Sequence, residues 1–218
     1  MNLKEYYKIL NFCIEKNAKL VAVSKTKPAE DIQTLYNENQ RVFGENKVQE
    51  LVEKQATLPK DIQWHFIGHL QKNKVKYIAP FIELIHAVDS LSLLKEINKK
   101  AIQNDRKINC FIQFHIAKED SKFGLRPEEI EAFFTETSLF KNANIIGVMG
   151  MATFTDNKQQ IKEEFKTLKD TFKFLKNNYF QDKEDFKEIS MGMSGDFEIA
   201  LNEGSTMVRV GSSIFGKR

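Results

Sequence analysis

Hydrophobic positions along the chain follow two spacings, one typical of an amphipathic helix and one typical of a buried strand. Residues 2–17 place apolar side chains on one helical stripe, namely Leu3, Tyr6, Tyr7, Leu10, Cys13 and Ile14. Runs of Val, Ile, Ala and Phe then alternate with further amphipathic segments, and Leu20 to Ser24 is typical of a strand buried in a parallel sheet. The pattern predicts strands and helices that take turns along the chain.

Eight strand-like runs are expected. They occupy residues 19–24, 41–44, 64–68, 84–88, 109–116, 145–149, 188–191 and 207–210. The helices expected between them span 28–39, from about 45, about 70–78, from 91 behind an N-cap at Ser90, from Pro127, about 158–177, and from a cap at Ser194 to Gly204.

The number of units favours one architecture over another. An open doubly wound sheet also alternates strands with helices, but it normally uses fewer units. No linker, low-complexity run or strong internal repeat divides the sequence. We therefore expect a single α/β domain over residues 1–218, a (β/α)₈ TIM barrel, with the extra N-terminal helix covering the bottom of the barrel.

Composition excludes several classes of protein. The net charge of +3 is a small difference between 33 basic and 30 acidic residues, which argues against a nucleic-acid-binding protein. Cys13 and Cys110 have neither metal-ligand nor disulfide spacing, as expected in a reducing compartment. The N-terminus does not resemble a signal peptide, and no apolar run is long enough to cross a membrane. We expect a cytoplasmic protein without a metal site.

The segment LVAVSKTKP places a lysine where the first strand ends. Barrels of this kind collect their chemistry at the carboxyl ends of the strands. Lys25 continues the side-chain parity of Val21 and Val23, whereas Lys27 lies beyond the strand end. A lysine shielded from water loses its proton more readily and attacks an aldehyde or ketone as an amine. A solvated lysine after a strand is the alternative, and this segment alone leaves both open.

Other polar or glycine positions follow the remaining strands. They are expected around the same opening of the barrel, at the carboxyl ends of the strands, which we call the mouth. They are Glu45, Asn46, Gly68, His69, Asp89, His115, Met151, Ser194, Arg209 and Gly211. Barrels often form a phosphate site after the seventh and eighth strands, where glycines permit close approach and backbone N–H groups attract an anion. SMGMSGD supplies Ser194 there, and TMVRVGSSIFG supplies Arg209, Gly211 and Ser212. Ordinary turns would use the same glycines.

A lysine opposite a phosphate site indicates a phosphorylated aldehyde, and pyridoxal 5'-phosphate (PLP) is the obvious candidate. Six segments then resemble the YggS/PROSC family, the pyridoxal phosphate homeostasis proteins: AVSKTKP (22–28), FGENKVQE (43–50), WHFIGHLQKNK (64–74), DSKFG (120–124), GMSGDFEIA (192–200) and GSTMVRVGSSIFG (204–216). The resemblance runs in order over nearly the whole chain. It implies a barrel of the alanine racemase N-terminal type that carries PLP as a Schiff base.

The resemblance implies a role for each matched residue. Lys25 would form the Schiff base, and Asn46 would lie near the cofactor ring or its 3'-hydroxyl. Ser194, the backbone around Gly211 and the hydroxyl of Ser212 would bind the phosphate.

Arg209 has two alternatives. Against the pyridine nitrogen, its permanent charge would keep that nitrogen unprotonated and make the ring a poor electron sink. Against the phosphate, it would be a bidentate anion ligand. The sequence does not choose between them.

Weaker candidates are Lys122 of DSKFG, which matches a motif lysine, and two histidines. His65 is expected to line the core of a strand, and His69 lies in a basic loop that either meets a phosphate or is solvated.

Three functions remain in competition. The first is a PLP-binding homeostasis protein, which sequesters the cofactor and delivers it to apo-enzymes. The second is a PLP-dependent amino-acid racemase, or a related enzyme with weak activity; racemases of this type need a second domain with a catalytic tyrosine. The sequence ends at Arg218, and no tyrosine falls at a predicted strand end, so we expect no such domain and a monomer that is a carrier rather than an enzyme. The third is a Schiff-base aldolase that needs no cofactor.

Overall fold

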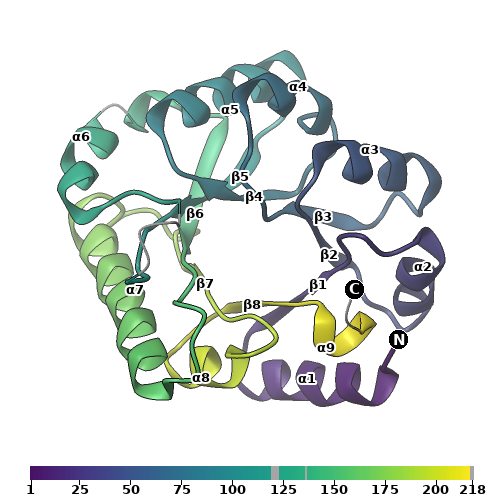
Figure 1. The fold of residues 1–218 in the computed structure, drawn as a ribbon. Helices are drawn as coiled ribbons and strands as arrows, with labels where there is room; N and C mark the ends of the chain where they lie inside the picture. The colour runs from purple at the N-terminus through teal and green to yellow at the C-terminus, as the bar shows by residue number, and fades with distance from the viewer. Residues whose placement is uncertain (119–122, 136, 217–218) are drawn as a thin grey trace.

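A ring of helices surrounds a closed barrel of parallel strands (Figure 1). The computed structural model describes residues 1–118, 123–135 and 137–216. Within them the barrel order is β1 to β8, so each strand pairs with the next and β8 pairs with β1. The expected (β/α)₈ barrel is therefore confirmed.

The strands are short, as in other tilted barrels. They are β1 Lys19–Val23, β2 Val42–Glu45, β3 Gln63–Phe66, β4 Leu84–Val88, β5 Ile108–Gln113, β6 Ala143–Met149, β7 Glu188–Ser190 and β8 Met207–Val210. The α-helices are α1 Leu3–Glu15, α2 Ala29–Asn37, α3 Val48–Thr57, α4 Val75–Ile78, α5 Leu91–Gln103, α6 Ile130–Thr135, α7 Lys158–Asn178, α8 Phe197–Asn202 and α9 Ser212–Phe215. Single 3₁₀ turns are η1 Lys72–Lys74, η2 Pro127–Glu129 and η3 Thr137–Leu139.

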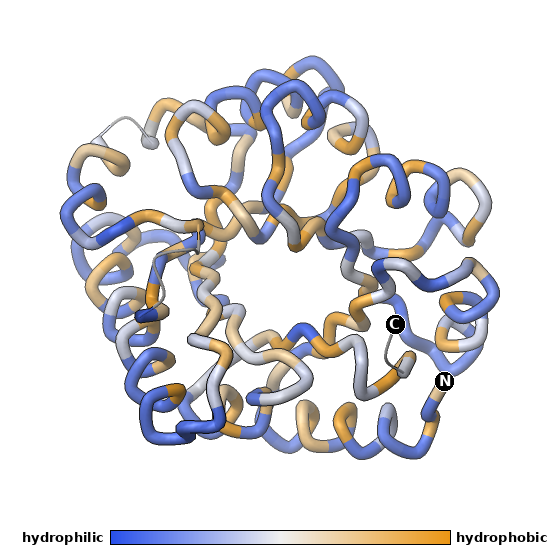
Figure 2. Tube along the Cα trace, viewed as in Figure 1, coloured by the Kyte–Doolittle hydropathy of each residue, from blue (hydrophilic) through white to orange (hydrophobic). Residues whose placement is uncertain are grey.

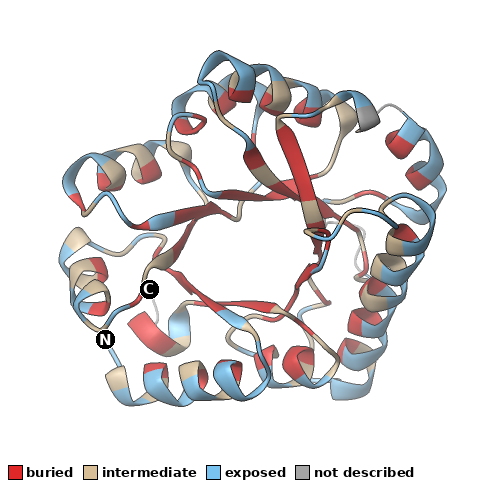
Figure 3. Ribbon diagram, turned by 180° about the vertical axis from the view of Figure 1, so that it is seen from behind, coloured by how far each residue is buried: buried red, intermediate tan, exposed pale blue. Residues whose placement is uncertain are grey.

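Side chains alternate between the barrel interior and the layer beneath the helices. On β1, Leu20 and Ala22 belong to the core between strands and helices, whereas Val21 belongs to a separate interior cluster. That cluster consists of Val21, Leu84, Ala87, Phe111, Met149 and Met207. Burial is concentrated on the strands and the inner faces of the helices (Figure 3), and hydropathy follows the same division (Figure 2). Lys25 lies an even number of residues after Val21, so the same alternation predicts that its side chain faces the barrel interior.

Strong local signals were reliable. β4 and β8 have the expected bounds, and Ser90 caps α5 by accepting a hydrogen bond from the Leu93 N–H at 3.4 Å. Pro127 opens a 3₁₀ turn that continues into α6. These elements were predictable because a cap, a proline or a continuous apolar run fixes each one locally.

Three expectations about helices were wrong. The N-terminal helix does not cover the barrel bottom: α1 lies in the outer ring between α8 and α2 (Figure 1), where Phe12 contacts Phe197 of α8. The helix expected from about residue 45 begins at Val48, because Glu45 still belongs to β2. Ser194 does not cap α8, since Asp196 holds the N-cap position. The short α9 was not predicted.

The two ends of the described chain meet at the β1–β8 junction. The Asn2 N–H donates to the Ile214 carbonyl at 2.7 Å, and α1 packs against α9. Among the described residues, no helix has the length and apolar character needed to cross a membrane.

Candidate functional site

The turn that carries Lys25 lies beside the end of β8. The β1–β8 ladder continues to the pair Ala22–Val210. A Cβ placed on Gly211 would lie only 2.9 Å from the Val23 carbonyl oxygen, so a side chain at Gly211 would push these segments apart. Lys25 is half-buried directly after this contact.

Lys27 is turned toward the C-terminal side of the mouth. Its Nζ donates to the carbonyls of Phe215 and Gly216, at 3.2 and 3.1 Å, and so ties the start of α2 to the end of α9. Lys27 therefore has a structural role at the β1–β8 junction.

Backbone N–H groups after β7 and β8 are available to an anion. Among the described residues, those of Ser194, Gly195, Ser212 and Ser213 donate to no protein acceptor. The two segments are joined, because the Gly211 N–H donates to Ser194 Oγ at 3.3 Å. Ser194 Oγ accepts this bond, and its O–H remains able to donate. The structure brings the predicted Ser194, Gly211 and Ser212 together into one concave set of donors, which we call the N–H nest.

A glycine conformation shapes the nest. Gly192 has φ +95°, and a Cβ there would lie 2.5 Å from the Ala200 side chain of α8. Its carbonyl accepts from the Arg209 N–H at 2.9 Å. Gly195, in contrast, faces open space with no atom within 4 Å of a placed Cβ. Only glycine fits at 192, where the chain must leave β7 tightly enough to reach β8.

Arg209 lies beneath the mouth rather than at its rim. Its side chain follows the inward parity of Met207, and only 4% of the residue is exposed. Nη1 donates to Ser190 Oγ at 2.6 Å and Nη2 to the Gly150 carbonyl at 3.1 Å. Burial lowers the pKa of the guanidinium to about 10, although the nearby Asp196 charge opposes this shift. The guanidinium therefore extends from β8 toward β7 and β6.

A buried hydrogen-bonded chain continues from Arg209 across the barrel. His86 Nδ1 lies 3.1 Å from Ser190 Oγ, and His86 Nε2 lies 3.0 Å from His65 Nδ1. Arg209 donates to Ser190 Oγ, and the direction of the two contacts that involve His86 depends on the tautomers of the histidines.

Both histidines are neutral. Burial lowers the pKa of His65 to about 3, with a smaller contribution from the Lys19 charge. Burial also lowers the pKa of His86 well below its usual value, and His65 and Arg209 add to the effect. The expectation that His65 lines the core is confirmed.

Two further mouth residues carry polar atoms without a partner. Asn46 Oδ1 and His115 Nδ1 are buried and accept no hydrogen bond from a described residue. Asn46 also lines a hollow of about 610 Å³ between α3 and α4, together with Phe66, His69 and Tyr77. Unsatisfied buried acceptors are rare in proteins, so each of these two atoms is a candidate ligand contact.

Glu45 does not point into the mouth, contrary to the expectation. Glu45 shares the parity of Phe43, which packs under the helices, and it is fully buried there. Its Oε1 accepts from Lys54 Nζ of α3 at 2.7 Å and from Ser24 Oγ at 2.6 Å. Burial raises the pKa of the carboxyl, while the hydrogen bonds from Lys54 and Ser24 act in the opposite direction. The period of two along β2 turns Glu45 outward.

The remaining candidates lie outside the centre of the mouth. His69 is exposed, with Nδ1 3.1 Å from Asp89 Oδ2 and its ring stacked on Phe123. Lys122 lies outside the described residues.

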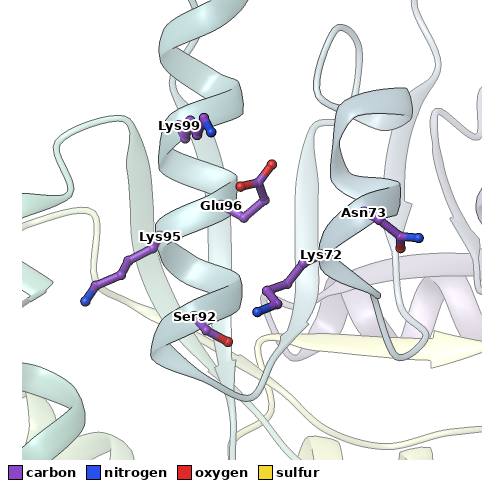
Figure 4. Close-up of a pocket in the computed structure, with 6 residues that line it drawn as sticks. All are labelled: Lys72, Asn73, Ser92, Lys95, Glu96 and Lys99. Carbon is purple, nitrogen blue, oxygen red and sulfur yellow. The ribbon is translucent and has the colours of Figure 1, made fainter.

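A second hollow, of about 390 Å³, lies between η1 and α5 (Figure 4). Lys72 points toward α5, but Lys95 and Asn73 point to opposite sides. These side chains do not converge on one point, so we do not assign a ligand there.

Sequence reasoning missed the parts of the site that depend on pairing between distant strands. Ser190 and His86 were not singled out, because each is one buried residue inside an apolar strand. Lys54 was missed for a different reason: a lysine four residues after Glu50 on a helix predicts an exposed ion pair. Its burial follows only from how α3 packs on β2.

The closed barrel, with a lysine turn beside the N–H nest, was compared with known protein families. The profile of a known family, described as "Alanine racemase, N-terminal domain", matches residues 2–218. Curated relatives are more specific. The pyridoxal phosphate homeostasis protein of Aquifex aeolicus is 38% identical over 94% of this chain and 89% of its own length. Its human counterpart is 39% identical over 92% of this chain and 76% of its own length. This chain belongs to the pyridoxal phosphate homeostasis protein family.

Solved structures agree. PipY of Synechococcus elongatus, determined without PLP, is 33% identical with a TM-score of 0.86, and the match covers 92% of this chain and 93% of PipY. PipY with PLP bound gives a TM-score of 0.84. Alanine racemase of Bartonella henselae, at 16% identity and a TM-score of 0.71, shares the fold over 98% of this chain and 59% of its own.

Proposed function

We propose that this protein binds PLP and acts in PLP homeostasis, as a carrier that keeps a reactive aldehyde covered. One observation carries the proposal: the Lys25 turn lies beside a nest of N–H groups that have no acceptor among the described residues. The names of the relatives and the PLP bound to PipY support it.

The residues present fit such a group. The N–H groups and hydroxyls of Ser194 and Ser212, with the Gly195 and Ser213 N–H groups, suit a phosphate. Asn46 Oδ1 lacks a hydrogen-bond partner among the described residues and suits a ring hydroxyl. PLP supplies an electrophilic aldehyde when bound.

Lys25 would hold that aldehyde: its ε-amine would be the group that joins the aldehyde carbon, with the aldehyde oxygen released as water. The link is reversible, so the same residue both covers the aldehyde and lets it go.

Arg209 belongs on the ring side of the site rather than on the phosphate. Nη1 and Nη2 are engaged by Ser190 and Gly150, toward β7 and β6, whereas the nest lies after β7 and β8. A charged guanidinium near the pyridine nitrogen keeps that nitrogen unprotonated, which limits carbanion chemistry and suits a carrier.

An amino-acid racemase is the second candidate, because the alanine racemase barrel is shared. The tyrosines closest to the start of the chain are committed elsewhere: Tyr6, Tyr7 and Tyr36 bond Gln40, Glu38 and Asp61. Tyr77 lines the hollow beside Asn46. Incubation of the PLP-loaded protein with D- and L-alanine, followed by chiral chromatography, distinguishes the candidates. A Schiff-base aldolase is tested by activity on sugar phosphates without PLP.

Three finer statements extend the proposal. The carrier delivers PLP to apo-enzymes, it works in the cytoplasm, and it is a monomer.

The first prediction concerns Lys25. Purified protein mixed with PLP should turn yellow, and borohydride should fix the cofactor to Lys25, as read by peptide mass spectrometry. Lys25→Ala should lose both the absorbance band and the adduct while its circular dichroism spectrum is unchanged. Lys60→Ala, at an exposed lysine, is the control. A band that persists in Lys25→Ala moves the anchor to Lys27 or Lys122, and a wild type that binds no PLP contradicts the proposal.

A further inference from the structure

A buried ionic cluster lies directly behind the turn that carries Lys25. Lys54 of α3 is 7% exposed, yet its ammonium meets three acceptors: Ser24 O at 2.9 Å, Glu45 Oε1 at 2.7 Å and Glu50 Oε1 at 2.6 Å. Three N–H donors for three acceptors describe a protonated ammonium with each donor in use. Lys54 is thus a structural cation and not a second amine nucleophile.

The cluster grips the backbone on both sides of Lys25. Before it, the Ser24 carbonyl accepts from Lys54, and the Ser24 hydroxyl donates to Glu45. After it, the Thr26 N–H donates to Glu50 Oε1 at 2.5 Å. The two peptide groups that flank Lys25 are therefore connected through a single pair of side chains, Lys54 and Glu50, one helical turn apart on α3.

The held backbone is in a costly conformation. Thr26 has φ +64°, a left-handed value that a β-branched residue seldom adopts. A short charge-assisted hydrogen bond to its N–H offsets this cost. Without the bond the turn would relax, and the direction of the Lys25 side chain would change with it.

We propose that Lys54 and Glu50 are positioning residues that hold Lys25 in the direction needed to join the PLP aldehyde. The proposal rests on the proposed function. It assigns to α3 a role in the covalent link alone, because neither residue belongs to the N–H nest or touches Arg209. The cluster is hence separable from phosphate and ring binding.

Pyridoxine 5'-phosphate distinguishes the covalent link from phosphate and ring binding. It has the ring and phosphate of PLP but an alcohol in place of the aldehyde. Glu50→Gln keeps the size of the side chain and removes its charge, at a position that is only partly buried. We expect Glu50→Gln to weaken PLP binding about tenfold or more, while its affinity for pyridoxine 5'-phosphate stays within twofold of wild type. Lys54→Met should show a larger loss of the same kind.

The controls lie on or beside the same helix. Glu53→Gln alters an exposed carboxylate one turn from Glu50 that contacts Gln49, and Lys60→Met alters an exposed lysine just past α3. Both should match wild type with both ligands. Hydrogen exchange of the unliganded protein adds an independent readout: amides of the peptide spanning residues 24–28 should exchange faster in Glu50→Gln than in Glu53→Gln.

Each outcome supports or overturns the proposal. A loss of affinity for PLP with unchanged affinity for pyridoxine 5'-phosphate supports a positioning role. Equal loss of both ligands, or no loss of either in Glu50→Gln, overturns it, and Glu50→Gln decides alone if Lys54→Met does not fold. A wild type that binds pyridoxine 5'-phosphate but never PLP would instead contradict the Schiff base of the proposed function.

Discussion

Arg209, Ser190, His86 and His65 form a line of donors and acceptors across the barrel interior. The Arg209 guanidinium donates to Ser190 Oγ at one end of this line. Ser190, His86 and His65 are buried and uncharged. Protonation of either histidine would therefore place a second positive charge in the barrel interior, near that of Arg209. The residues below the mouth thus favour one charge state, with the positive charge on the arginine.

The second prediction follows from the sign of these pKa shifts. Both histidines have a lower pKa in the folded protein than in the unfolded chain, so unfolding takes up protons below pH 6.5 and stability falls as pH falls. At pH 5 the loss from His65 is about 2 kcal/mol, at about 1.4 kcal/mol per pH unit, and His86 acts in the same direction. The raised pKa of Glu45 acts in the opposite sense, since its contribution falls as pH rises.

Urea unfolding at pH 7 and pH 5 measures the effect. The double variant His65→Leu/His86→Leu should be less stable at pH 7 but should lose much less on acidification than wild type. His69→Leu, at an exposed histidine, should keep the wild-type difference between the two pH values. An unchanged pH dependence in the double variant would show that other groups cause the loss.

Local patterns in the sequence pointed to several residues that lie close together in the structure. The lysine at the end of the first strand and the serine and glycines of the last two loops were all assigned from sequence, and the structure brings them together. The expectation for Glu45 was wrong because the sequence pattern ends this strand at Gly44, whereas β2 includes Glu45 and turns its side chain outward. Ser190 and His86 pair across non-adjacent strands, and no local pattern encodes such a contact.

At the scale of elements, the segment from β7 to β8 depends on the backbone of Gly192. The third prediction is that Gly192→Ala lowers the free energy of unfolding by about 2–4 kcal/mol, because alanine at φ +95° is strained and its Cβ would lie 2.5 Å from Ala200. Gly195→Ala, with open space around its Cβ, should change stability by less than about 0.5 kcal/mol. Urea unfolding compares the two, and equal effects would contradict a special role for Gly192.

Helix bounds show why sequence reasoning succeeds for some elements and fails for others. α7 matched its expected bounds almost to the residue, because a long amphipathic stripe defines it. α1 formed where expected but took a place in the outer ring, since its apolar stripe packs against α8 and α9. Local periodicity predicts that a helix exists; its position depends on partners far away in sequence.

For the whole molecule, a ligand that contacts both the β1 turn and the β8 nest should stabilise the barrel at its closing junction. The fourth prediction is that PLP at 100 times its dissociation constant adds about 2.7 kcal/mol to the free energy of unfolding, since it binds only the folded state. Thermal unfolding with and without PLP measures this, and inorganic phosphate at the same concentration is the control. A melting temperature independent of PLP would contradict a site that spans the junction.

The pairing of β1 with β8 also has a consequence for folding kinetics. Lys19 and Met207 are paired although they lie near opposite ends of the described chain. Among the strand pairs of the barrel, β1 and β8 are therefore the farthest apart in sequence. The loop-closure entropy of this pairing makes it a late event, and during synthesis it must wait until β8 has left the ribosome. Lys25 and the N–H nest come together only at that step. A nascent chain therefore does not have both halves of the candidate site together until the barrel closes.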